Sequence, residues 1–578
     1  MTQASVAPRL QEKHGADSAA HVDQCGFLRL MPPELRERCK TSPHVVRYLH
    51  DLPTDEMGIP QFYPKLNKKL GDLAYRNLFY PVSDEVLIHV WSKPGEERDL
   101  YIPVEPSTKV NLAGKLARVE ERLLRVAHRF DHEQSAVNRA KALTDSLKRI
   151  CKVGNGKSNP GGWRLFHFGK TEEDQVAVTP QEYNALKYMM VRDKAGLGVL
   201  QPMVFDSNIE DISCSGVGNV YVEHKVFKSM KSAINFTTHE QLDQFVLRLS
   251  EQIKRPVTVR NHIVDAVLPD GSRINIVYGR EVSQRGSNFT IRKFSDNPLS
   301  IFELIEFGAL DYRMAAYMSF ILEEGMNTFV SGETASGKTT LMNALTTFVH
   351  PSAKIVSIED TPEVQVPHKN WLREVAKNPR QGERAATVTM MDLLKAALRQ
   401  RPNLIIVGEI RGEEGAIAFQ AMQTGHAVMA TFHASSVEKL IQRLTGHPIN
   451  IPKTYVDNLN VVVIQSAVKL PNGKQARRAL SISEIVGYDP VAGTFSFVEV
   501  FRWNPAKDIF EFIGNNNSYL LEQKIAFRRG IPLNKKQEIY KLLERRAKLL
   551  EKLHKEKKVV GFHELYQVLA EAQRKGLF

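Results

Sequence analysis

The sequence has little cysteine and no long hydrophobic run. Its 578 residues include four cysteines, Cys25, Cys39, Cys151 and Cys214, which are far apart and form no Cys-x-x-Cys pair. This pattern favours neither a disulfide framework nor a zinc ribbon. No window approaches the roughly 20 apolar residues of a membrane-spanning helix, and the first residues lack the apolar core of a secretory signal. We therefore expect a cytoplasmic protein, or a peripheral partner of something membrane-bound.

Positive charge exceeds negative charge. Lys and Arg number 78 and Asp and Glu 65, a net charge of +13, which suits a nucleic acid, an anionic membrane or an acidic partner without choosing among them. Basic residues are densest at 541–558, where leucines recur at helical spacing, so we expect an amphipathic helix with a solvated face. Residues 525–558 hold only two aromatics, Phe527 and Tyr540, whereas stacking on nucleic-acid bases would need aromatics between the basic residues.

Local patterns separate strand-rich from helical stretches. Alternating apolar residues predict strands in 79–91 and 100–106, and helical periodicity covers 111–150. From Ile301 to about residue 490, apolar strands alternate with amphipathic helices, which is typical of a parallel α/β domain. We expect the remainder to be mostly helical.

The most specific motif is a phosphate-binding loop. An apolar strand leads into GETASGKT, which fits G-x-x-x-x-G-K-[ST] completely, and an amphipathic helix follows at once. Backbone N–H groups and the helix N-terminus hold phosphate oxygens, Lys338 reaches the β- and γ-phosphates, and the Thr339 hydroxyl ligates Mg²⁺. The expected nucleotide-binding residues are Gly332, Glu333, Thr334, Ala335, Ser336, Gly337, Lys338, Thr339 and Thr340.

Charged and polar residues follow three further strands. A buried strand ends in Glu409, the place of a Walker B carboxylate, which can bind Mg²⁺ through water or polarise the attacking water. Another strand ends in Glu359 and Asp360, with Glu363 soon after, and one of these carboxylates is expected to orient the water. His433 follows the next strand and can contact the γ-phosphate. We therefore expect Lys338, Glu359, Glu363, Glu409 and His433 to carry the chemistry.

The phosphate loop and the three strand-end segments, taken in their order along the chain, resemble those of the secretion ATPases of the type II/type IV superfamily. The phosphate loop, IEDTPE as Asp box, IIVGEIRG as Walker B and GHAVMATFHA as His box occur in that family's order. The archaeal branch is matched more closely, because 208–218, 265–276, 285–294 and 470–485 look like its members and no tetracysteine module follows the His box. The resemblance covers about residues 185–520.

The resemblance implies an α/β fold with a RecA-like P-loop domain, preceded by a smaller α/β N-terminal domain and helical segments. Five ranges are expected: a variable N-terminal region (1–100), a helical segment (101–180), an α/β N-terminal domain covering the neighbouring nucleotide (181–297), the RecA-like ATPase domain (298–515) and a basic helical tail (516–578).

The resemblance also implies a function. Its members are hexameric, Mg²⁺-dependent ATP hydrolases that power a pilus-like filament (an archaellum, for example) or a secretion machine at the inner face of the cell membrane. Expected partners are a polytopic membrane platform protein, accessory cytoplasmic motor proteins and an anionic membrane surface, but no nucleic acid. The family's N-terminal domain supplies arginines to the next subunit, and Arg273, Arg285 and Arg292 match these positions.

Two other functions remain open from the residues alone. A RecA-type nucleic-acid translocase would use the same core, and the charge of +13 suits it. A nucleotide-gated scaffold with negligible turnover is the other, although Glu359, Glu409 and His433 together argue against it.

Overall fold

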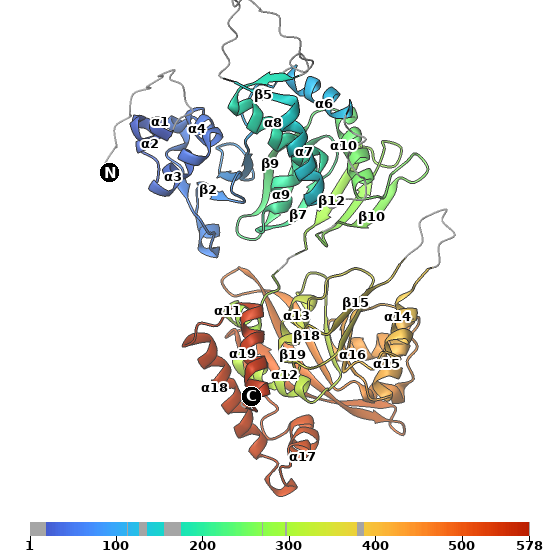
Figure 1. Cartoon of the computed structure of the whole chain (residues 1–578). Helices are drawn as coiled ribbons and strands as arrows, with labels where there is room; N and C mark the ends of the chain where they lie inside the picture. The colour runs from blue at the N-terminus through green and yellow to red at the C-terminus, as the bar shows by residue number, and fades with distance from the viewer. Residues whose placement is uncertain are drawn as a thin grey trace, which may run out of the picture. The chain divides into compact units, whose positions relative to one another are not determined.

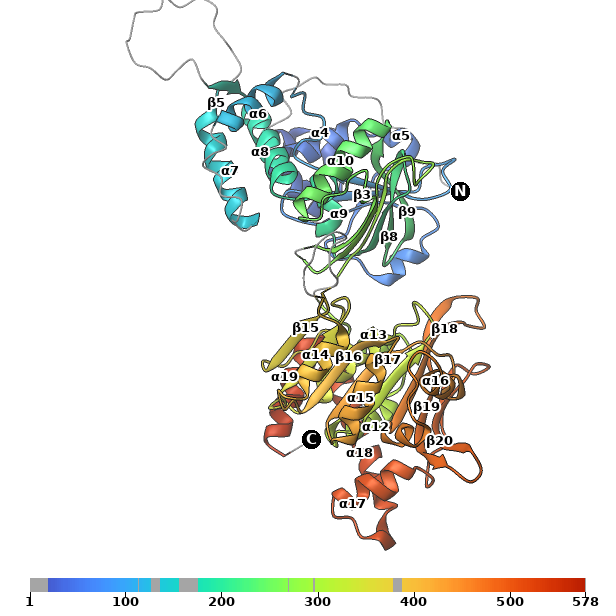
Figure 2. The same cartoon turned by 90° about the vertical axis from the view of Figure 1, so that its right-hand side faces the viewer.

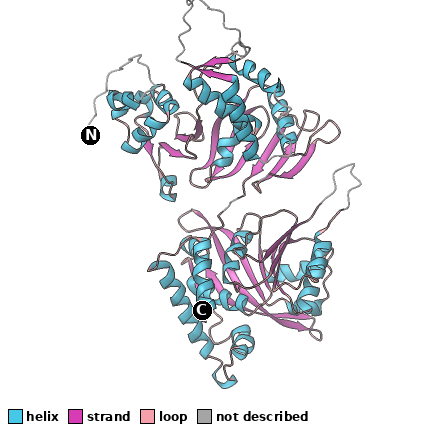
Figure 3. Ribbon diagram, in the orientation of Figure 1, coloured by secondary structure: helices cyan, strands magenta, loops and turns pink. Residues whose placement is uncertain are grey.

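The computed structural model describes residues 19–112, 114–125, 136–154, 175–268, 270–294, 297–377 and 387–576. The chain divides into two compact units, Met1–Phe294 and Ser295–Phe578, shown in Figures 1 and 2 and coloured by secondary structure in Figure 3. The boundary between the units falls at the start of the sequence SDNPLS, residues 295–300. The five expected ranges remain predictions. No described helix combines the length and apolar character needed to cross a membrane.

A ten-stranded sheet forms the centre of the first unit. Its order is β1-β2-β3-β4-β9-β8-β7-β12-β11-β10. The strands predicted in 79–91 and 100–106 are present, and β4 joins β9 in parallel through Leu100 opposite Lys231 and Tyr101 opposite Ser232. The bounds are β1 Gln61–Phe62, β2 Asn77–Pro81, β3 Leu87–Trp91, β4 Leu100–Val104, β7 Ile209–Cys214, β8 Gly218–His224, β9 Lys228–Phe236, β10 Ile263–Val267, β11 Arg273–Val277 and β12 Asn288–Arg292.

Strands β2 to β4 are covered on both faces, because alternate side chains enter two different cores. Phe79, Leu87 and Val104 pack with the four short N-terminal helices, whereas Tyr80 and Tyr101 join the main core of the unit. The helices predicted within 111–150 are α6 and α7. The helix bounds are α1 Ala19–Gln24, α2 Gly26–Arg29, α3 Pro33–Thr41, α4 Pro43–His50, α6 Lys115–Arg125, α7 Ala136–Ile150, α8 Pro180–Lys194 and α10 His239–Gln252.

A nine-stranded sheet forms the centre of the second unit. Its order is β15-β14-β16-β17-β13-β18-β19-β20-β21, and the first six strands are parallel. This arrangement confirms the α/β fold class with a RecA-like P-loop domain. The bounds are β13 Thr328–Gly332, β14 Ile355–Glu359, β15 Trp371–Val375, β16 Leu404–Ile410, β17 Ala427–Phe432, β18 Val461–Lys469, β19 Gln475–Asp489, β20 Thr494–Asn504 and β21 Ile509–Phe512.

Helices cover both faces of this sheet (Figures 1 and 2), which explains the continuous apolar runs of its parallel strands. α11, α12, α13, α18 and α19 share one core, and α14, α15 and α16 share the other. The bounds are α11 Ile301–Glu306, α12 Tyr312–Glu323, α13 Lys338–Leu345, α14 Met390–Ala397, α15 Glu414–Gln423, α16 Val437–Thr445, the π-helix η7 Leu520–Ile525, α17 Ala526–Arg528, α18 Glu538–Lys555 and α19 Phe562–Arg574.

Two expectations for the C-terminal part hold only in part. The stretch after residue 490, expected to be mostly helical, begins with two strands, because β20 pairs antiparallel with β19 and β21 pairs antiparallel with β20. The basic helix α18 is amphipathic as expected, but Arg546 lies in its buried face. There its Nη1 donates a hydrogen bond to Glu323 Oε2 at 2.7 Å, and its guanidinium carbon lies 4.0 Å from the centre of the Phe320 ring. Long side chains can bury a charge that is both paired and stacked.

Candidate active site around the phosphate loop

The phosphate loop connects the buried strand β13 to helix α13. Gly337, the residue before the helix, has a φ of 91°, which glycine adopts without strain. A Cβ atom on Gly332 would lie 2.0 Å from the carbonyl oxygen of Gln465 on β18. Only glycine therefore fits where the loop leaves the sheet.

Lys338 lies inside the loop. Its Nζ donates hydrogen bonds to the carbonyl oxygens of Gly332 and Glu333, each at 3.0 Å. Burial lowers the pKa of Lys338, and the charges of Glu409 and Glu363 partly offset this. The ammonium group is thus held where a phosphate chain would cross the loop.

The two glutamates of the Asp box have different environments. Glu359 is buried, and its Oε1 accepts hydrogen bonds from the N–H groups of Glu363 and Val364 at 2.7 Å each. Burial raises the pKa of Glu359. Glu363 instead approaches the loop, where its Oε2 accepts a hydrogen bond from the Thr339 hydroxyl at 3.3 Å. Glu359 therefore shapes the turn, and Glu363 is the carboxylate beside the expected metal ligand.

Glu409 and His433 meet at the carboxyl ends of β16 and β17. Their Oε1 and Nε2 atoms are 3.5 Å apart, and the His433 Nε2 also lies 3.4 Å from the Thr334 hydroxyl oxygen. Burial lowers the pKa of His433, and the nearby charge of Lys338 lowers it further. The sequence-predicted residues Lys338, Thr339, Glu363, Glu409 and His433 therefore surround one loop.

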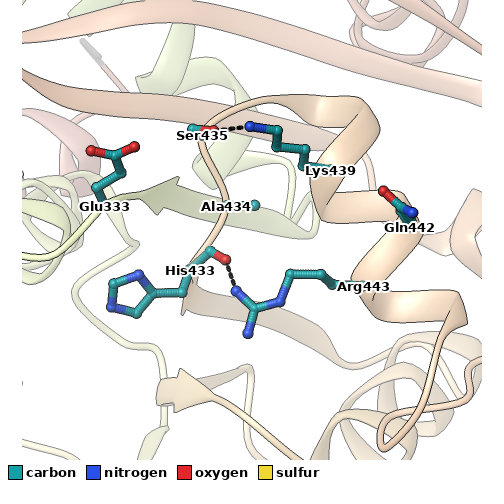
Figure 4. Close-up of a pocket in the computed structure, with 7 residues that line it drawn as sticks. All are labelled: Glu333, His433, Ala434, Ser435, Lys439, Gln442 and Arg443. Atoms are coloured by element: carbon teal, nitrogen blue, oxygen red, sulfur yellow. Dashed lines mark hydrogen bonds between the residues drawn. The ribbon is translucent and has the colours of Figure 1, made fainter.

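A pocket of about 390 Å³ opens beside this loop (Figure 4). The Lys439 ammonium donates a hydrogen bond to the Ser435 hydroxyl at 3.2 Å, and the Arg443 guanidinium donates one to the carbonyl oxygen of His433. Both cations belong to α16, so this helix fixes positive charge next to His433. Glu333 of the loop also lines the pocket.

The donors around the loop suit Mg²⁺ bound together with a nucleotide. Thr339 offers a hydroxyl, Glu363 offers a carboxylate, and the buried Oε1 of Glu409 has no hydrogen-bond partner among the described residues. Within the described part of the chain, no cluster of three or more His, Cys, Asp or Glu residues could hold a metal by itself. Mg²⁺ in nucleotide sites is held by one or two carboxylates plus substrate phosphates, and Glu363 and Glu409 are carboxylates of this kind.

The chain is similar to known proteins of archaea and bacteria. The family model for "Type II/IV secretion system protein" matches residues 193–499. An uncharacterized protein of the archaeon Methanocaldococcus jannaschii is 42% identical over 546 residues, 94% of this chain and 97% of that protein. A type IV secretion system PtlH homolog of Bordetella bronchiseptica is 30% identical over 272 residues, 43% of this chain and 79% of that protein.

This chain belongs to the type II/IV secretion system protein family. Among solved structures, the Legionella pneumophila ATPase DotB matches with a TM-score of 0.37 and 20% identity, covering 50% of this chain and 79% of DotB.

Two further basic residues of this family member, which were not among the predicted site residues, contact the site. Arg411 donates hydrogen bonds to Glu409 Oε2 at 2.5 Å and to Asp360 Oδ2 at 3.1 Å. Arg477 of β19 donates one to the carbonyl oxygen of Ala335 in the loop at 3.0 Å. Arg411 stands two positions after Glu409, a spacing that could have identified it. No local pattern singles out Arg477.

The three arginines expected to act in trans all belong to the first unit, where two of them lie together and the third lies apart. Arg273 of β11 and Arg292 of β12 are directly paired, so they lie side by side on one face of the sheet. Arg292 also pairs in register with Asp211 of β7. Arg285 lies in the turn before the opposite end of β12, where its carbonyl oxygen accepts a hydrogen bond from the Val217 N–H at 3.2 Å. The pair and the single arginine can therefore be tested separately.

Proposed function

We propose that this family member is a Mg²⁺-dependent ATP hydrolase. The observation that carries the proposal is the convergence on a complete phosphate loop of Lys338, at the start of α13, with Glu409 and His433, at the ends of two neighbouring parallel strands. A scaffold that only binds nucleotide would need the loop but not the strand-end carboxylate and histidine.

Each residue has a distinct role in this proposal. Lys338 and the loop N–H groups bind the phosphates, and Thr339 and Glu409 hold Mg²⁺, which would neutralise phosphate charge. Glu363 accepts the proton of the attacking water or orients it, and Glu359 acts as a positioning residue through the N–H of Glu363. His433 contacts the γ-phosphate, so it can sense whether that phosphate is present.

Family membership supports a wider proposal. The chain would act as a homohexamer in which Arg273, Arg285 or Arg292 of one subunit completes the site of its neighbour. The ring would work at the cytoplasmic face of the cell membrane with a polytopic platform protein and accessory motor proteins. It would power a secretion machine or a pilus-like filament such as an archaellum.

Two variants test the hydrolase. Lys338→Ala should abolish nucleotide binding and turnover together. Glu409→Gln should bind a fluorescent ATP analogue while phosphate release falls by about 10²-fold or more. Near-normal turnover in both variants would disprove the assignment. Turnover stimulated by DNA or RNA, rather than by anionic lipid, would favour the nucleic-acid translocase.

A further inference from the structure

A second pocket, of about 460 Å³, lies in the ATPase unit. It is at the amino ends of the parallel strands, whereas the phosphate loop is at their carboxyl ends. Its walls include Asn327 and Asn460, which directly precede β13 and β18, and His426, which precedes β17. β13 and β17 lead from these amino ends to the phosphate loop and to His433. A strand of five residues spans about 16 Å, so an occupant of this pocket would not touch a bound nucleotide.

The outer wall of the pocket comes from η7 and α17, which Figures 1 and 2 place at the far end of this unit from α13. Phe527 on this wall is 71% exposed, whereas Met326 and Met422 form a buried apolar floor. An exposed phenylalanine beside apolar floor residues gives a partner's side chain a surface on which to pack.

The wall is held rigidly. Arg528 donates a hydrogen bond to the carbonyl oxygen of Glu324 at 2.6 Å, and Arg529 pairs with Glu323 at 2.7 Å. Arg529 also lies over the Phe320 ring at 4.5 Å. Because these contacts fix α17 to the end of α12, a ligand would meet a surface that needs little ordering.

Lys524 is a cation of this pocket with no carboxylate in direct contact among the described residues. It is half-buried and makes no ion pair with a described residue; its contact is with the Tyr519 ring at 5.6 Å. Burial and the charge of Arg528 lower the pKa of Lys524, and the charge of Glu484 partly offsets this. An incoming carboxylate would satisfy an ammonium group that is already partly desolvated.

We propose that this pocket binds a short acidic segment of a partner protein, with a carboxylate at Lys524 and a neighbouring apolar side chain against Phe527. A membrane would be bound by several exposed, unpaired cations. Here the unpaired lysine is recessed in a concavity, and Arg528 is engaged with Glu324. A nucleic-acid strand would need a row of phosphate contacts, which a single unpaired lysine does not offer.

The test uses the full chain without nucleotide, so its outcome is independent of the ATPase proposal. Phage-displayed random peptides are selected on the wild-type protein, and selected peptides are labelled and titrated by fluorescence anisotropy. Acidic peptides that contain an aromatic or aliphatic residue should be enriched. Lys524→Gln and Phe527→Ser should each weaken their binding about five-fold or more, and Lys524→Arg should retain it.

The residues that follow α17 in the sequence offer matched controls. Lys535 and Leu533 are exposed residues outside the pocket, and Leu533 is 68% exposed. Lys535→Gln and Leu533→Ser should bind the selected peptides as the wild type does. The proposal is overturned if selection enriches basic or uncharged peptides, or if all four substitutions weaken binding equally. It is also overturned if only phosphatidylglycerol vesicles or a single-stranded oligonucleotide bind in a Lys524-dependent way.

Discussion

Arg411 and Glu409 form a direct ion pair in which Nη2 lies 2.5 Å from Oε2. The other guanidinium nitrogen reaches Asp360 at 3.1 Å, so one arginine links the Walker B strand to the Asp box. Glu409 is also the proposed carboxylate for Mg²⁺. The guanidinium and the metal would therefore compete for the same carboxylate group.

Arg411→Gln should lower the Mg²⁺ concentration needed for ATP binding. The variant frees Glu409 and removes a positive charge, and both changes favour the metal. Arg411 is largely exposed, so the expected shift is about two- to five-fold. Binding of a fluorescent ATP analogue over a Mg²⁺ titration measures it. Arg443→Gln, which removes a cation bound to the His433 carbonyl rather than to a carboxylate, is the control. An unchanged Mg²⁺ requirement for Arg411→Gln would show that no competition exists.

Glu363→Gln should impair turnover, whereas Glu359→Gln should impair stability. The first removes the charge beside Thr339, so turnover should fall about 10²-fold with the melting temperature preserved. The second places an amide nitrogen where Glu359 Oε2 faces Arg373 at 3.6 Å, so it should lower unfolding free energy by about 1–3 kcal/mol. Thermal melts and steady-state phosphate release separate the two effects. Equal loss of turnover with unchanged melts would make Glu359 a direct participant.

The stability of the protein should carry a pH dependence that comes from His433. Its pKa is lowered from 6.5 in the folded protein, so the unfolded chain binds more protons in the window below pH 6.5. This contribution to stability is complete above pH 6.5 and is lost as the pH falls toward the folded pKa. Melting temperatures of the wild type should drop relative to those of His433→Asn between pH 7 and pH 5. Parallel curves for the two proteins would contradict a lowered pKa.

Completion of the site in trans predicts rescue in mixtures. Lys338→Ala chains and chains lacking the correct arginine should each be inactive on their own. Mixed rings would pair some intact loops with intact arginines and should recover phosphate release. Arg273→Ala and Arg292→Ala should behave alike because the two residues are neighbours, whereas Arg285→Ala tests a separate place.

The matched control combines Lys338→Ala with Glu409→Gln. Both substitutions lie around one loop of one chain, so every site in a mixed ring keeps one of the two defects, and this mixture should recover no phosphate release. Co-purification of an untagged variant with a tagged one shows separately that mixed rings form. With that established, no rescue by any arginine variant would mean that one chain holds the complete site.

The sequence predicted the parts of the site that depend on local order. The strand, glycines, lysine and helix of the phosphate loop are contiguous, so Lys338 and Thr339 could be placed before any fold was known. Glu409 and His433 could be placed because each follows a buried apolar strand. The carboxyl ends of neighbouring parallel strands meet at one edge of the sheet.

What the sequence could not predict depends on contacts between distant segments. Glu359 ends β14 and Glu363 follows it, and what distinguishes them is the burial of Glu359, which also faces Arg373 of β15. Arg477 reaches the loop because β19 pairs with β18. Likewise, β20 and β21 alternate weakly in apolar character. The strand conformation of β20 depends on pairing with β19, and that of β21 on pairing with β20.

The parallel pairing of β4 with β9 has a consequence for synthesis of the chain. Leu100 leaves the ribosome about 130 residues before its partner Lys231, which at ordinary translation rates is roughly ten seconds. During that interval β4 is paired with β3 on one side only, and its other edge is open. Such an open edge can pair with another nascent chain. A pause in translation between these two strands should therefore increase aggregation, whereas a pause after residue 294 should not.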